Sequence, residues 1–100
     1  MSVERSDNGR QTRYELHDQD GLSCVLTYTS EPGEPATWKI LLPGPDGTED
    51  LYGTHRFISP DATQLEKWLT PLVGAGRAQE LASAVDAAPP GPAAWTPGPG

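Results

Sequence analysis

The spacing of apolar residues changes once along this chain, at Ser59-Pro60. Before this point apolar and polar residues alternate, which is the two-residue period of strands with one buried face. After it the apolar residues recur at the spacing of an amphipathic helix, namely at Leu65, Trp68, Leu69, Leu72 and Val73. Strands followed by a helical stripe predict the α+β class, in which an antiparallel sheet is covered on one face by helices.

The alternation predicts four strands in an up-and-down meander, over residues 12–17, 22–29, 36–42 and 48–58. Turn-forming runs of Asp, Gly and Pro separate them. The side chains expected to point inward are Tyr14, Leu16, Leu22, Cys24, Leu26, Tyr28, Trp38, Ile40 and Leu42. The last strand is ambiguous: the inward side chains can be Leu51, His55 and Phe57, or else Tyr52, Thr54, Arg56 and Ile58. A bulge at Gly53 would let Leu51 and Ile58 both point inward.

One or two helices are expected after Ser59, which can cap the first of them. Pro71 should kink or end this helix near Thr70, and a second helical stretch is expected over residues 77–87. Residues 12–88 therefore form a single α+β domain. Residues 1–11 are polar and are expected to be a flexible N-terminus. Residues 89–100 form a Pro/Gly-rich tail, in which Trp95 is the large apolar residue and the candidate interaction anchor.

The composition narrows the set of partners. The 100 residues carry a net charge of -7, and such a surface repels phosphate, which argues against nucleic acid and anionic membranes. With 35% hydrophobic residues the core is thin, so pairing with a second copy would add buried area. Cys24 is the single cysteine and is expected to be buried. Without disulfides, a signal segment or a membrane-length apolar run, a cytoplasmic protein is expected. The abundance of Ala, Gly and Pro, and of Arg over Lys, indicates a GC-rich bacterial genome.

Motifs for catalysis, cofactors or metals are lacking in the sequence. The acidic turn at 18–21 has its glycine too early for a calcium-binding EF-hand loop. His17 and His55 fall on strands expected to lie about 14 Å apart. Residues 74–76 lack the third glycine of a dinucleotide-binding loop. We therefore expect no enzyme, no cofactor and no bound metal.

Three functions are compatible with this pattern. The leading hypothesis is a small acidic interaction or regulatory module that dimerises or docks on another protein, because a meander has free sheet edges. The second is a single-strand nucleic-acid or anion binder that uses the open sheet face. Its candidate residues are Arg13, Lys39, Arg56 and Tyr52. The third is a small-ligand pocket, or a minor enzymatic role, between sheet and helices, with His55 and Tyr52.

Overall fold

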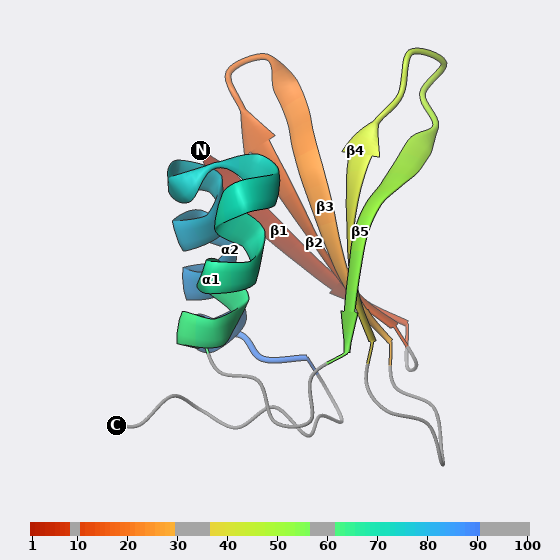
Figure 1. Ribbon diagram of the computed structural model, residues 1–100. Coiled ribbons are helices and arrows are strands. Elements are labelled where there is room, and N and C mark those ends of the chain that lie inside the picture. The colour runs from red at the N-terminus through yellow and green to blue at the C-terminus, as the bar shows by residue number, and fades with distance from the viewer. Residues whose placement is uncertain (9–10, 30–36, 57–61, 91–100) are drawn as a thin grey trace.

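The computed structural model describes residues 1–8, 11–29, 37–56 and 62–90. They form an antiparallel sheet followed by two helices that lie on the same side of it (Figure 1). The strands are β1 (Ser2–Asp7), β2 (Gln11–Asp18), β3 (Gly21–Thr29), β4 (Thr37–Pro43) and β5 (Glu49–Arg56). The helices are α1 (Ala62–Val73) and α2 (Ala75–Ala87). The strand order in the sheet is β1-β2-β3-β4-β5, so the meander predicted from the sequence is present.

The prediction of four strands is wrong, because the described sheet has five. The additional strand, β1, lies within residues 1–11, which were expected to be flexible. It pairs with β2 from Ser2 opposite His17 to Asp7 opposite Thr12. Alternation does not reveal this strand because Val3 is its single apolar residue, and an edge strand with charged side chains needs little apolar surface.

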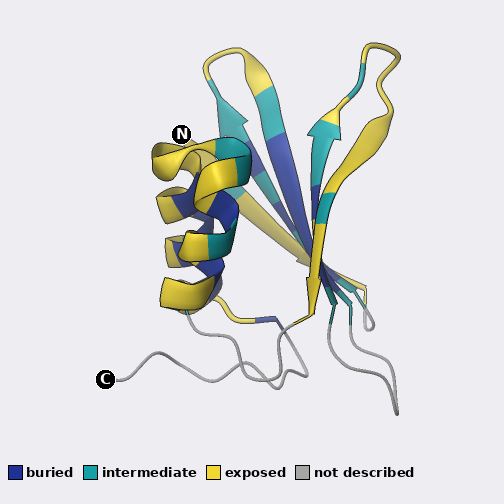
Figure 2. Cartoon of the chain, in the orientation of Figure 1, coloured by how far each residue is buried: buried dark blue, intermediate teal, exposed yellow. Residues whose placement is uncertain are grey.

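The core lies between the helices and the inner face of the sheet, where Figure 2 shows the buried residues gathered. Tyr28 and Trp38 meet there edge to face, with ring centroids 4.9 Å apart. The buried core residues are Tyr14, Leu16, Cys24, Leu26, Tyr28, Trp38, Ile40, Leu65, Leu69, Ala78, Leu81, Ala82 and Val85. Most of the predicted inward side chains are confirmed, whereas Leu42, Trp68, Leu72 and Val73 pack against the core and stay partly exposed. The prediction for Leu22 is wrong, because a register shift after Leu16 places Leu22 opposite His17 on the outer face.

The two helices are separated by one residue. α1 continues past Pro71 and ends at Val73, so of the two effects predicted for Pro71, an end of the helix near Thr70 is wrong. Gly74 follows with a φ of 94°, a conformation that glycine adopts without steric cost, and α2 begins at the next residue. Neither helix in the described ranges is long and apolar enough to cross a membrane. The expected capping residue Ser59 and the tail anchor Trp95 lie outside the described residues.

The helices divide the inner face between them. α2 contacts β1 and β2, where the hydroxyl of Tyr14 donates to the carbonyl of Ala88 at 2.5 Å. Arg5 of β1 donates to the carbonyl of Pro89 at 2.8 Å. α1 lies on the other side, towards β5, where Gly53 approaches it closely. β5 thus forms one edge of the described sheet and lies beneath α1. The candidate site is on this edge strand.

Candidate functional site: the β5 edge strand

β5 contains a β-bulge that decides which way its side chains point. Gly53 lies opposite Ile40 and Leu51 lies opposite Leu41, so Tyr52 is an extra residue on the β5 side. The bulge foreseen near Gly53 is therefore present. Gly53 shares the inner face with the buried Ile40, whereas Leu51 lies opposite Leu41 on the outer face. The prediction that the bulge would let Leu51 point inward is therefore wrong, and Ile58 lies outside the described residues. Neither phase proposed for this strand holds along its whole length, because the bulge changes the phase midway.

β5 is exposed along most of its length, as Figure 2 shows. Leu51 and Tyr52 are 58% and 52% exposed, and with Met1 they are the exposed large hydrophobic residues among those the structure describes. Within the described part of the chain β5 pairs with β4 alone. Its other side therefore presents backbone N–H and C=O groups next to two large apolar side chains, which is the arrangement that favours pairing with a further strand.

Arg13 on β2 reaches across the outer face to the start of β5. Its Nη1 donates to Oε1 of Glu49 at 2.7 Å and its Nη2 to Oε2 of the same carboxylate. Its Nε donates to Glu15 at 2.7 Å. The pKa of Arg13 is raised, chiefly by the hydrogen bond to Glu49, and the pKa values of both carboxyl groups are lowered by the guanidinium. Two carboxylates thus face one cation, which leaves this cluster with one net negative charge.

The same cluster explains an unexpected feature of β3. Val25 and Thr27 lie on the outer face, away from the helices, yet both are buried. Thr27 is opposite Arg13, and Val25 is opposite Glu15 and Leu41. Arg13 lies on β2 and Glu49 on β5, and β3 and β4 lie between these two strands. The side chains of the cluster therefore cross the middle strands and shield them from water.

The residues proposed for anion binding are close to their expected places. Register puts Arg13, Lys39 and Arg56 on the outer face, opposite Thr27, Thr54 and Thr37 respectively. Lys39 and Arg56 are exposed, while Arg13 is held by two carboxylates. The fourth candidate, Tyr52, is the bulge residue. An anion on this face would therefore meet two carboxylates beside the cations, which weakens the electrostatic attraction that such binding requires.

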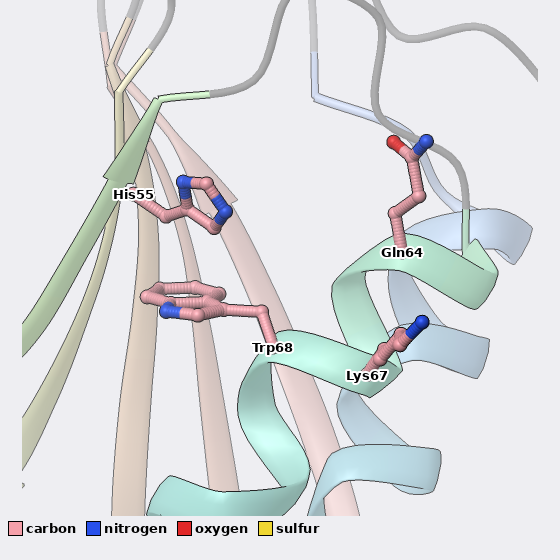
Figure 3. A pocket seen from close by; sticks show the side chains of 4 residues that line it. All are labelled: His55, Gln64, Lys67 and Trp68. Atoms are coloured by element: carbon pink, nitrogen blue, oxygen red, sulfur yellow. The ribbon is translucent and has the colours of Figure 1, made fainter.

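An open pocket of about 400 Å³ lies between β5 and α1 (Figure 3). His55 comes from β5, whereas Gln64, Lys67 and Trp68 come from α1. The His55 ring meets the indole of Trp68 edge to face, with centroids 5.5 Å apart. Of the two residues predicted for such a pocket, His55 lines it and Tyr52 does not. Gln64 and Lys67 were missed because they are polar positions of an amphipathic helix, although their spacing with Trp68 places all three on one helical face.

A second group of polar side chains lies on the outer face at the opposite edge. Glu4, Glu15 and His17 each offer a ligand atom, all within 4.8 Å of one another. Nε2 of His17 is 3.4 Å from Glu15 and 3.8 Å from Glu4. The group was not foreseen because it needs β1, which carries Glu4. The Arg13 guanidinium already occupies Glu15, so a cation here would compete with that hydrogen bond.

Comparisons of the chain with protein-family models, with curated proteins and with solved structures find no match. The functional interpretation therefore depends on the features just described. Among them, the β5 edge combines three: unpaired backbone within the described sheet, exposed apolar side chains, and charges at both strand ends.

Proposed function

We propose that this protein is a small, non-enzymatic interaction module that binds another polypeptide strand along the edge of β5. The observation that carries the proposal is the exposure of Leu51 and Tyr52 on an edge strand whose outer side pairs with no other described strand. A strand added there would extend the sheet, with backbone hydrogen bonds providing affinity and alternate side chains providing specificity. On the outer face an apolar side chain of the added strand would meet Leu51.

The other edge of the sheet is less suited to this role. β1 carries Glu4, Arg5 and Asp7, and its one apolar side chain, Val3, packs against the core. β5 carries as many charged side chains (Glu49, Asp50 and Arg56), so the difference between the two edges is that β5 also exposes Leu51 and Tyr52. Arg5 is also engaged with the carbonyl of Pro89. Of the two edges, β5 is therefore the one that supports the proposal.

The test is binding to an array of short extended peptides with alternating apolar residues, including the β5 sequence itself. We expect the wild-type protein to bind a subset of them and the β5 amides to gain protection from hydrogen exchange on binding. Leu51→Lys should abolish this binding, because a lysine at the edge opposes strand addition. Gln79→Lys, which adds the same charge at an exposed position of α2, is the matched control and should bind as the wild type does.

Two results would overturn the proposal. One is a wild-type protein that binds none of the peptides and shows no self-association. The other is binding that Leu51→Lys leaves intact and that protects amides elsewhere than in β5.

A further inference from the structure

We infer that the strand that pairs with β5 is β5 of a second copy, in the antiparallel register that places Glu49 of one copy opposite Arg56 of the other. This inference rests on the proposed function and names its partner. The resulting dimer would have one continuous sheet across its two-fold axis, with both helical layers on the same side of that sheet. A sheet of this size lies within the range that open sheets reach.

The β5 sequence is complementary to itself in this register. It reads Glu-Asp-Leu-Tyr-Gly-Thr-His-Arg, so it begins with two acidic residues and ends with a histidine and an arginine. A two-fold axis between the fourth and fifth residues pairs Glu49 with Arg56, Asp50 with His55, Leu51 with Thr54, and Tyr52 with Gly53. Opposite charges directly across a strand pair are stabilising and like charges destabilising.

The bulge is what allows this register. In a regular strand, positions seven apart point to opposite faces, so Glu49 and Arg56 could not lie side by side in one pair. In β5 the extra residue Tyr52 shifts the phase by one. The β4 partners of Glu49 and Arg56 are Pro43 and Thr37, which are an even number of residues apart and therefore share a face. Both charged side chains thus lie on the outer face.

The inner-face pair follows the same rule. Asp50 lies opposite Leu42 and His55 opposite Trp38, and these β4 residues are again an even number of positions apart. Asp50 and His55 of two copies would therefore meet on the inner face. The faces match at every pair on either side of the bulge, and the overlap covers the full strand.

Charge around Glu49 favours a cationic neighbour. The Glu15–Arg13–Glu49 cluster has one cation for two carboxylates, and Arg56 of the second copy would supply the missing positive charge. A carboxylate accepts up to about four hydrogen bonds, so Glu49 can serve both guanidinium groups. The net charge of -7 on each copy opposes association, but this repulsion is screened beyond about 8 Å at physiological salt. The close pairs at the edge decide the outcome.

β1 does not pass the same test. No register shift interrupts its pairing with β2, so self-pairing must keep the regular alternation of faces. The two registers with the largest overlap are centred on Glu4 and on Arg5, and they place each of these residues opposite its own copy. Like charges would meet at the centre of either pair. Self-complementarity is therefore a property of β5 and not of edge strands in this sheet generally.

The test uses two charge reversals in the full chain, Glu49→Lys and Arg56→Glu, each studied alone and as an equimolar mixture by sedimentation equilibrium. Wild type is expected to dimerise. Each variant alone places like charges at both ends of the pair, which should weaken self-association about tenfold or more. In the mixture the new lysine of one copy faces the new glutamate of the other while the native pair is kept at the other end, so dimers should return.

The mixture distinguishes a loss of pairing between copies from a loss of folding within one copy. Glu49→Lys also breaks the contact with Arg13 inside the same copy, but mixing with a second variant cannot repair an intramolecular loss. Glu80→Lys, at an exposed position of α2, makes the same change in charge and should dimerise as the wild type does. Far-UV circular dichroism establishes that each variant is folded.

Three results would overturn the inference: a monomeric wild type over the accessible concentration range, a dimer that neither reversal weakens, or a mixture that does not recover. A monomeric wild type that nonetheless binds other strand peptides in a Leu51-dependent manner would leave the proposed function standing and remove self-pairing alone. Failure of both assays would remove the two proposals together.

Discussion

Replacing Tyr14 and Tyr28 by phenylalanine removes the same atom from two buried tyrosines of the sheet, and we expect opposite effects on stability. Both side chains are essentially inaccessible to solvent. The hydroxyl of Tyr14 donates to the Ala88 carbonyl at 2.5 Å and so ties the end of α2 to β2. The hydroxyl of Tyr28 is buried and has no hydrogen-bond partner among the residues that the structure describes.

The magnitudes follow from these environments. A typical intramolecular hydrogen bond contributes about 1 kcal/mol net, so Tyr14→Phe should lower the free energy of unfolding by about that amount. A buried polar group without a partner costs about 1–3 kcal/mol, so Tyr28→Phe should raise the free energy of unfolding by about 1 kcal/mol or more. The two variants should therefore differ by at least about 2 kcal/mol, on opposite sides of the wild type.

Urea denaturation followed by far-UV circular dichroism measures both effects. For a chain of this size the slope of the free energy against urea is about 1–3 kcal/mol/M, so each midpoint should move by roughly 0.3–1 M, in opposite directions. In thermal melts the same change shifts Tm by about 4–8 °C. The reasoning is refuted if Tyr28→Phe is destabilised as Tyr14→Phe is, because its hydroxyl would then be forming a stabilising hydrogen bond.

Three further predictions concern other parts of the sheet. Burial raises the pKa of the Cys24 thiol to about 11, so a thiol reagent at pH 8 should label the protein only after urea is added; rapid labelling of the native protein would contradict this. The hydrogen bond from Arg13 holds the pKa of Glu49 below its ordinary value of 4.5, so its stabilisation is present above that pH and is lost as the pH falls through the lowered pKa. Glu49→Gln should thus be less stable than wild type in urea at pH 7 and equal to it in acid, and a gap of the same size at both pH values would count against the contact. A Cβ on Gly53 would lie 2.9 Å from Cδ1 of Leu72, whose side-chain end can turn away, and 3.2 Å from Cγ2 of the buried Ile40. Gly53→Ala should therefore cost about 1 kcal/mol by overpacking against Ile40, and an unchanged urea midpoint would contradict this.

The sequence predicted the parts of this fold in which apolar side chains repeat. Tyr14, Leu26 and Ile40 mark the inner face of three strands, and all three are buried as expected. β1 could not be predicted in the same way, because Val3 is its one apolar side chain and its one contact with the core. The burial of Val25 on the other face was also hidden, because it depends on Arg13 crossing two strands to a residue distant in sequence.

For the candidate site, the sequence indicated a bulge near Gly53 but predicted the wrong direction for Leu51, which is exposed on the outer face. The phase of β5 depends on its pairing with Ile40 and Leu41, and such pairing is a property of two strands together. The opposite charges of Glu49 and Arg56 can be read from the β5 sequence. Without the bulge, these two residues would be assigned to opposite faces and would not be recognised as a pair.

The bonds from Tyr14 to Ala88 and from Arg5 to Pro89 join residues 74 and 84 positions apart in the chain. Contacts this distant require large loops to close, so they are expected to form after the pairing of neighbouring strands. A nascent chain on the ribosome must expose its first two strands, without their helical cover, until α2 has been synthesised. For this protein, the interval between the synthesis of the sheet and that of α2 is when protection by chaperones would matter most.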